Sequence, residues 1–221
     1  IPDSIVEITK KKINIDNKTN PMKNITLTTL LLFITITAFS QSATTYFSPV
    51  ASPQATVSQN VGMTKISISY SSPGVKGRKI FGELVPYDQI WRAGANSPTK
   101  IKFSTSVKIG DKTLRAGEYS IAITPRSEGE WTVDFNSAGK YPFAYMTDGK
   151  IDMEAYNKDL AHSINVQPRV SGSNFERLFY RIDANDNKVA RVIMIWSNAV
   201  VEFHVDAMPE KHLENFAKTL N

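Results

Sequence analysis

From about residue 60 onward, apolar and polar residues alternate along the chain. This two-residue period is that of a β-strand with one face in a core and the other in water. The alternation recurs in five runs, at residues 65–70, 100–103, 119–123, 131–136 and 201–206. A sixth run, residues 188–196, is more continuously apolar and predicts a central strand covered on both faces.

Turn-forming residues separate these runs. Gly110-Asp111 lies between two short β-prone stretches, and glycine takes the positive φ that a two-residue hairpin turn requires. Residues 185–187 (Asn-Asp-Asn) and 197–198 (Ser-Asn) predict two later turns. Strands recurring every ~8–12 residues between such turns indicate an antiparallel sandwich or barrel. We predict an all-β, single-domain antiparallel β-sandwich.

Two segments depart from the strand period and predict helices. Residues 151–161 predict a short helix in a long connecting loop, with apolar residues near one face. Residues 209–220 predict a C-terminal helix, because Pro209 suits a first turn and later apolar residues recur at helical spacing. Those apolar residues are Leu213, Phe216, Ala217 and Leu220.

Residues 22–40 have the three-part layout of a secretory signal peptide. A short basic start at Met22 is followed by an apolar stretch from Ile25 to Phe39 and by small residues before Gln41. About 15 apolar residues at 1.5 Å each are too short to span the ~30 Å hydrocarbon core as an anchor. We expect residues 1–21 to be an upstream or non-native segment, 41–221 to be the mature domain, and its location to be periplasmic or secreted.

The composition narrows the function classes. The 221 residues include no cysteine and three histidines, which excludes disulfide scaffolds, thiolate metal sites and a lipidated cysteine. The net charge is +5, and it falls to +3 without residues 1–40, which contain five lysines and three acidic residues. We therefore expect no nucleic-acid partner, no membrane anchor after signal cleavage, and no metal or cofactor.

The segment from Ser72 to Asn96 is rich in glycine, proline, cations and aromatic residues, which predicts a loop of defined shape. Arg78, Lys79 and Arg92 are candidates to bind an anion such as a carboxylate or phosphate. Trp91 offers a ring to a sugar or another flat ligand, and Asn96 completes the candidate ligand-binding set.

A structural role for the same segment is the alternative. In this interpretation Phe81, Tyr87 and Trp91 close the open end of the sandwich, and the arginines pair with Glu83 and Asp88. The glycines do not form a nucleotide-binding motif, because Gly-x-x-x-x-Gly-Lys-Ser/Thr is absent.

Four motifs in order carry a family resemblance. They are SPQATVSQNVG (52–62), KGRKIFGELVPYDQIWRAGAN (76–96), LRAGEYSIAITP (114–125) and EWTVDFN (130–136). From about Ser48 to Asp206 the chain resembles the bacterial DUF2911 domain family. The resemblance implies a secreted or periplasmic all-β domain of unknown function, without implying a reaction. The chain departs from the family pattern at Asp88, where glycine is common, at Ala93, where threonine is common, and at Ser97, where an acidic residue is common.

Two further groups are candidates for chemistry. Glu202, His204 and Asp206 are alternate residues that share one strand face. They could form a carboxylate-assisted histidine base or part of a metal site, although a solvated face has the same pattern. The second group lies in the long connection after residue 136. It predicts either a ligand groove or a satellite apolar cluster beneath a loop, and comprises Tyr141, Phe143, Tyr145, Met146, Met153 and Tyr156.

We expect a non-catalytic binding or structural module of the cell envelope, with no catalytic residues assigned. Its ligand, a small molecule or a glycan, would bind at the Trp91–Arg92 loop. The alternative is a small-molecule or glycan hydrolase that uses His204 or an acidic residue close to that loop. The oligomeric state does not follow from the sequence.

Overall fold

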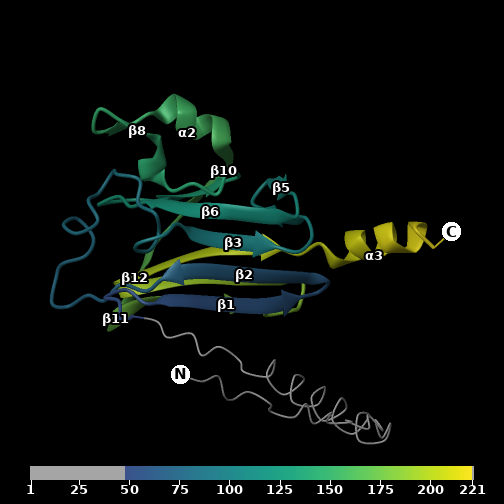
Figure 1. Cartoon of the computed structure of the whole chain (residues 1–221). Helices are drawn as coiled ribbons and strands as arrows, with labels where there is room; N and C mark the ends of the chain where they lie inside the picture. The colour runs from purple at the N-terminus through teal and green to yellow at the C-terminus, as the bar shows by residue number, and fades with distance from the viewer. Residues whose placement is uncertain (1–47, 221) are drawn as a thin grey trace, which may run out of the picture. The chain divides into compact units, whose positions relative to one another are not determined.

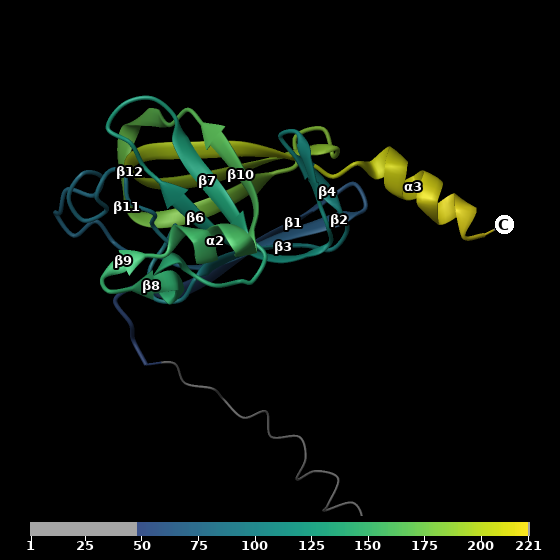
Figure 2. The ribbon, with the colours of Figure 1, turned by 90° about the horizontal axis from the view of Figure 1, so that it is seen from above.

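The computed structural model describes residues 48–220, so the predicted segments 1–21 and 22–40 lie outside the described residues. Two antiparallel sheets form the two layers of a β-sandwich, as the alternation predicts (Figures 1 and 2). The first sheet has the order β1 (Gln54–Val61), β2 (Thr64–Ser71), β3 (Thr99–Phe103), β6 (Gly117–Thr124), β7 (Trp131–Asn136) and β10 (Leu160–Val166). The second has the order β11 (Arg169–Asp183), β12 (Val189–Asp206), β4 (Val107–Ile109) and β5 (Lys112–Leu114).

The core lies between the inner faces of the two sheets. Ile66 and Ile68 of β2 are fully buried, as their alternation with polar neighbours predicts. Aromatic side chains meet across the layers: the rings of Phe135 in β7 and Phe203 in β12 lie 5.4 Å apart, edge to face. Burial of these inner faces is the main source of the sandwich's stability, since the chain has no disulfide.

The predicted hairpin at Gly110-Asp111 is confirmed, with β4 paired to β5 and Gly110 at φ 59°. The predicted turn at Ser197-Asn198 is wrong, because β12 continues through it to Asp206. Ser197 takes a positive φ of 53°, and the register against β11 shifts nearby, so the pair forms a bulge within the strand.

Two predictions for the later strands also need correction. The run 188–196 is central in its sheet, but it is not covered on both faces as predicted. On its outer face Ile193 is buried and the other residues are half-buried. The pattern did not identify β11, whose first half is largely exposed and polar and whose pairing with β12 is irregular.

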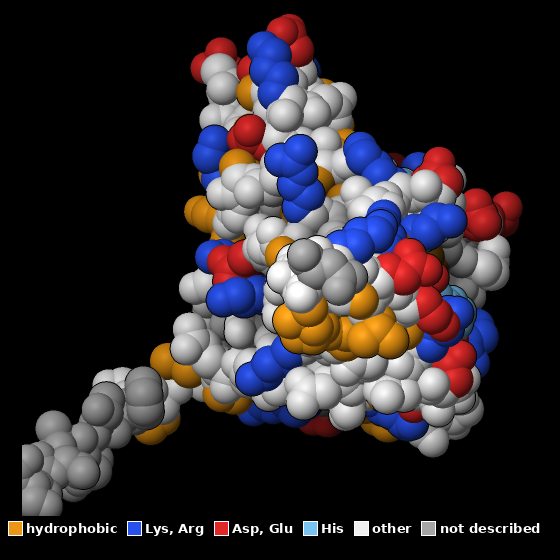
Figure 3. Space-filling model, turned by 90° about the vertical axis from the view of Figure 1, so that its right-hand side faces the viewer, with side chains coloured by type: hydrophobic (Ala, Val, Ile, Leu, Met, Phe, Trp, Pro, Cys, Tyr) orange, Lys and Arg blue, Asp and Glu red, His pale blue; other side chains and the backbone are white. Residues whose placement is uncertain are grey.

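Both predicted helices form, over shorter ranges. The 151–161 segment contains α2 (Met153–Asp159), whose N-cap Asp152 accepts a hydrogen bond from the Ala155 amide at 3.0 Å. The 209–220 segment contains α3 (Pro209–Lys218), which projects from the end of the sandwich (Figure 1). No residue of α3 is buried, so its apolar side chains Leu213 and Phe216 are exposed. Figure 3, which views the end of the molecule from which α3 projects, shows hydrophobic side chains grouped at the surface there.

The connection between β7 and β10 also holds a 3₁₀ turn, η1 (Pro142–Tyr145), and a small hairpin of β8 (Met146–Thr147) and β9 (Lys150–Ile151). We call residues 137–159 the cover segment, because they lie over the outer face of the first sheet beside β7 and β10 (Figure 2). No helix of residues 48–220 has both the length and the apolarity to cross a bilayer.

Candidate functional site

The loop of residues 72–96 is attached to both sheets. At its start, the Val75 amide donates to the Glu176 carbonyl at 2.7 Å, which fixes the loop to β11 of the second sheet. At its end, Trp91 and Ile123 exchange backbone hydrogen bonds of 2.8 and 2.7 Å, which fix the loop to β6 of the first sheet. The loop therefore bridges the layers at one end of the sandwich.

Backbone conformation gives this loop a defined course. Asp88 and Ala93 take positive φ values of 60° and 53°, a region that glycine enters without strain. At Gly82, with φ 88°, the ring of Tyr87 lies so close that a Cβ would stand 2.6 Å from it. The course of the loop therefore depends on positive φ at glycine and non-glycine residues alike.

The structure separates the five candidate ligand-binding residues. Arg78, Trp91 and Arg92 line one pocket, whereas Lys79 and Asn96 do not. Lys79 forms an exposed ion pair with Glu83 at 3.4 Å, and the Asn96 side-chain amide donates to the Ser52 carbonyl at 3.1 Å.

Arg78 serves the loop itself. Its Nε donates to the Val75 carbonyl at 3.0 Å and one Nη donates to the Gly74 carbonyl at 2.7 Å. These two bonds use guanidinium donors to hold the backbone at the start of the loop. The expected pairing of the arginines with Asp88 does not form: Asp88 lies 3.9 Å from Arg126 instead.

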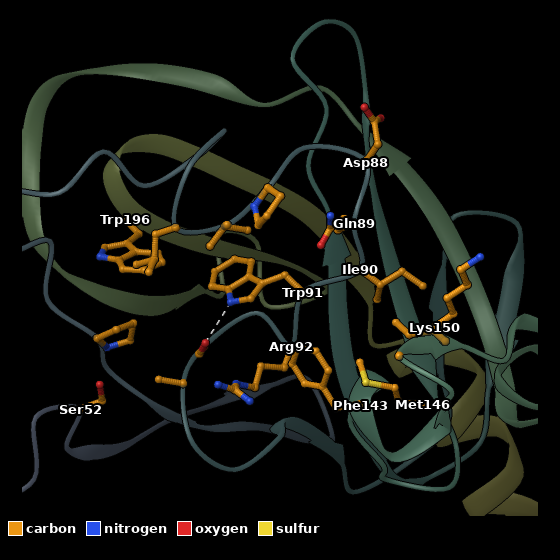
Figure 4. A pocket seen from close by; sticks show the side chains of 18 of the residues that line it. Ser52, Asp88, Gln89, Ile90, Trp91, Arg92, Phe143, Met146, Lys150 and Trp196 are labelled. Carbon is orange, nitrogen blue, oxygen red and sulfur yellow. Dashed lines mark hydrogen bonds between the residues drawn. The ribbon is translucent and has the colours of Figure 1, made fainter.

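Trp91 is fixed among other aromatic rings. Its indole stacks on Trp196 of β12 with centroids 5.7 Å apart, meets Phe81 edge to face at 6.0 Å, and donates from Nε1 to the Gly94 carbonyl at 3.0 Å (Figure 4). Because one face already contacts Trp196, the ring is a rigid wall rather than an open platform for a sugar. Trp91 therefore packs among aromatic rings, as the structural interpretation expects, and it also lines the pocket. Its binding of a ligand stays a prediction.

Arg92 has a different environment from Arg78. Its guanidinium carbon lies 5.6 Å from the centroid of the Phe143 ring in the cover segment, in a cation–π contact. Its Nε is buried and has no hydrogen-bond partner among the described residues. Figure 4 shows Arg92 and Phe143 side by side at the same wall of the pocket.

A buried polar network holds the cover segment in place. Tyr156 of α2, with 1% of its surface exposed, donates to the Asp134 carboxylate of β7 at 2.9 Å. Ser163 of β10 donates to the other Asp134 oxygen at 2.6 Å. Burial raises the pKa of Asp134, although these two hydrogen bonds counteract the shift. Burial also raises the pKa of Tyr156, which keeps its hydroxyl protonated as a donor.

A second set of hydrogen bonds closes the stem of the cover segment. The Asn136 side chain donates to the Tyr145 hydroxyl at 2.8 Å, and that hydroxyl donates to Asp159 at 2.7 Å. The hydrogen bond from Tyr145, with help from Lys140, lowers the pKa of Asp159. Ser137 and Asp159 join the two ends of the segment through a backbone bond of 2.9 Å. The segment is therefore anchored at its stem and at α2.

The 72–96 loop, the cover segment and Trp196 together line a half-open pocket of about 620 Å³ (Figure 4). This volume is within the usual range for sites that bind small molecules. Four exposed hydrophobic side chains line it, and apolar side chains grouped in a pocket are typical of small-molecule sites. They are Leu84, Phe143, Met146 and Met153, each 44–46% exposed.

Sequence reasoning noted Phe143, Met146 and Met153 as a group separate from the loop. The structure brings these three into the same pocket as Trp91, whereas the side chains of Tyr145 and Tyr156 in that group are buried. Leu84 and Trp196 were not singled out. Their only sequence signals are an apolar residue in a glycine-rich loop and a tryptophan ending a strand run.

The Glu202-x-His204-x-Asp206 group lies away from the pocket. His204 is on the outer face of β12 with its side chain 62% exposed, and it does not line the pocket. Glu202 pairs with Arg169 at 2.7 Å, and Asp206 accepts a hydrogen bond from the Met208 amide at 2.8 Å. Across residues 48–220, no cluster of three or more histidine or acidic side chains is arranged to hold a metal ion.

Residues 52–205 match the model of the family described as "Protein of unknown function (DUF2911)". The match begins just before β1 and ends one residue before the end of β12, so it contains both sheets, the 72–96 loop and the cover segment but not α3. The chain shows no significant match to a curated protein or to a solved structure. Because more than half of the chain matches, and the match includes every element that forms the pocket, the protein belongs to the DUF2911 family.

Proposed function

We propose that this protein is an exported module of the cell envelope or periplasm that binds a small organic molecule in the pocket and does not transform it. One observation carries the proposal: two segments about 50 residues apart in sequence converge on one pocket and line it with exposed apolar side chains. Such side chains are stabilised when a ligand covers them.

The charged groups of the pocket favour binding over catalysis. Among its lining residues, Asp88 is the one carboxylate, and its side chain is 75% exposed beside Arg126. Hydrolysis by general acid–base catalysis requires an acid and a base within reach of the same substrate. His204, the base of the alternative hydrolase hypothesis, lies on the outer face of β12, outside this pocket.

The test uses N-phenyl-1-naphthylamine, an uncharged apolar dye that fluoresces in an apolar site. We expect the wild-type protein to bind it and the double variant Phe143→Ser/Met146→Ser to bind about tenfold more weakly. About 60 Å² of lost apolar contact at roughly 25 cal/mol per Å² corresponds to that factor.

The matched control is Leu213→Ser/Phe216→Ser in α3, where both side chains are also more than half exposed. This variant removes similar apolar surface outside the pocket, so it should bind the dye as the wild type does. Equal loss of binding in both variants, or no binding by the wild type, would contradict the proposal.

The export part of the proposal rests on the pattern of residues 22–40. Amino-terminal sequencing of the protein recovered from the periplasm or medium should begin at Gln41. Exported protein that retains Leu30 would contradict cleavage after Ser40.

A further inference from the structure

We infer that the ligand of this pocket is a small apolar anion, with an apolar body and one negatively charged head such as a carboxylate, and that Arg92 binds the head. The inference rests on the proposed binding function and specifies the chemistry of the ligand. It depends on which charged residues of the pocket lining already have hydrogen-bond or ion-pair partners in the structure.

The lining carries more positive than negative charge. Arg78, Arg92 and Lys150 contribute cations, and Asp88 is the one carboxylate. Asp88 lies 3.9 Å from Arg126, a cation outside the lining, so its charge is partly balanced there. A ligand with a negative charge therefore complements this pocket better than a neutral or cationic one.

Arg92 and Lys150 are the lining cations whose side chains have no hydrogen bond or ion pair among the described residues, and Arg92 alone of the two has a planar guanidinium that can donate to both oxygens of a carboxylate. Arg78 already donates to two backbone carbonyls of the loop. Arg92 instead contacts the ring of Phe143, and none of the ion pairs among residues 48–220 involves it. The guanidinium carbon lies 5.6 Å from the centroid of the Phe143 ring, and the Arg92 side chain donates no hydrogen bond to another described residue. Its donors therefore remain for a carboxylate.

The burial of the unpaired atoms limits which donors a ligand can reach. Nε of Arg92 and Nε1 of Trp196 have no hydrogen-bond partner among the described residues, but both atoms are buried and are not accessible from the pocket. The two Nη groups of Arg92 are therefore the donors of that side chain that a ligand in the pocket would meet.

The apolar side chains of the lining indicate that the ligand has an apolar body. Leu84, Met146 and Met153 line the pocket with flexible apolar side chains. Methionine adapts to ligands of irregular shape, so the pocket selects for an apolar body more than for one particular outline. An organic carboxylate with an aromatic or aliphatic body satisfies both parts of the site.

Two dyes that differ by one anionic group test the inference. They are 8-anilinonaphthalene-1-sulfonate and its uncharged parent N-phenyl-1-naphthylamine, each titrated by fluorescence into wild-type protein, Arg92→Gln and Lys79→Gln. Lys79→Gln is the matched control, because it removes one positive charge from the same loop outside the pocket lining.

We expect Arg92→Gln to weaken the anionic dye by about tenfold to a hundredfold relative to the uncharged dye, the usual effect of a hydrogen bond to a charged group. Lys79→Gln should leave the ratio of the two dissociation constants unchanged. In wild-type protein, added salt should weaken the anionic dye and not the uncharged one. Decanoate should displace the anionic dye at lower concentration than 1-decanol does.

The outcomes separate the two proposals. If Arg92→Gln leaves the ratio of the two dissociation constants unchanged, Arg92 does not bind the anionic group. The inference then fails, while the proposed binding function stands. The inference also fails if decanol displaces the dye as well as decanoate does. If neither dye binds wild-type protein, the proposed function fails as well.

Discussion

The outer faces of the two sheets differ although their sequences alternate in the same way. On the first sheet, Asp134 is 6% exposed and its carboxylate accepts hydrogen bonds from the neutral hydroxyls of Tyr156 and Ser163. On the second sheet, Glu202 meets the charged side chain of Arg169, and His204 is in solvent. The cover segment lies over the first face, and no element of the described chain covers His204.

The difference shows that an acidic residue in an alternating strand does not reveal its own environment. Burial raises the pKa of Asp134, whereas hydrogen bonds from Arg191 and the Asn185 amide lower the pKa of Asp183 on the second sheet. The covered face also supports a wall of the candidate pocket, because Phe143 and Met146 belong to the cover segment. The open face carries ion pairs and no part of the pocket.

The largest expected effect comes from removing the anchor of the covered face. Tyr156→Ala deletes a fully buried ring and the hydroxyl that pairs with Asp134. We expect the free energy of unfolding, measured by urea denaturation, to fall by about 3–5 kcal/mol. Tyr156→Phe keeps the ring and should lose only about 1–3 kcal/mol. A loss below about 1 kcal/mol in Tyr156→Ala would show that the cover segment does not depend on this anchor.

The pH dependence of stability should have opposite signs on the two faces. The pKa of Asp134 is raised above its ordinary 3.8, so the proton it holds when folded stabilises the protein at low pH, and this contribution is lost as pH rises through the folded pKa. The pKa of Asp183 is lowered from 3.8, so its contribution is present above that value and is lost as pH falls.

Urea denaturation of Asp134→Asn and Asp183→Asn across the acidic range checks these signs. Relative to the wild type, Asp134→Asn should gain stability as pH rises above about 3.8, whereas Asp183→Asn should lose stability as pH rises towards that value. Parallel profiles for the two variants would contradict the contrast between the faces.

The smallest effect should come from the open face. His204 is largely exposed, and its Nε2 lies 3.9 Å from a carboxylate oxygen of Glu202. His204→Ala should change the free energy of unfolding by no more than about 0.5 kcal/mol. It should also leave binding of N-phenyl-1-naphthylamine unchanged, because His204 does not line the pocket. A loss of dye binding in this variant would show that His204 contributes to the binding site.

Much of the fold follows from the sequence, since strands with one buried face carry a two-residue period and the Gly110-Asp111 hairpin has its own turn signal. Strand β11 could not be predicted from the sequence, because its first half is exposed and its register is irregular, and both remove the two-residue period. The bulge at Ser197 resembles a turn in sequence because both use residues that tolerate positive φ.

The candidate site was predictable only in part. The glycine-rich segment identified Trp91 and Arg92 locally, but the meeting of Arg92 with Phe143 depends on how the cover segment folds back over β7 and β10. The burial of Asp134 has the same origin. Contacts of this kind join residues far apart in sequence, and the pattern around each residue does not contain them.

The most direct test of the pocket uses the three indole N–H signals of the protein in a ¹⁵N NMR titration with N-phenyl-1-naphthylamine, assigned by Trp→Phe substitution. Trp91 and Trp196 line the pocket, whereas Trp131 does not, is 5% exposed and donates to the Arg126 carbonyl at 2.9 Å. We predict that the dye shifts the signals of Trp91 and Trp196 and leaves that of Trp131 nearly unchanged. A shift of Trp131 as large as that of Trp91, or no shift at all at saturating dye, would contradict the account.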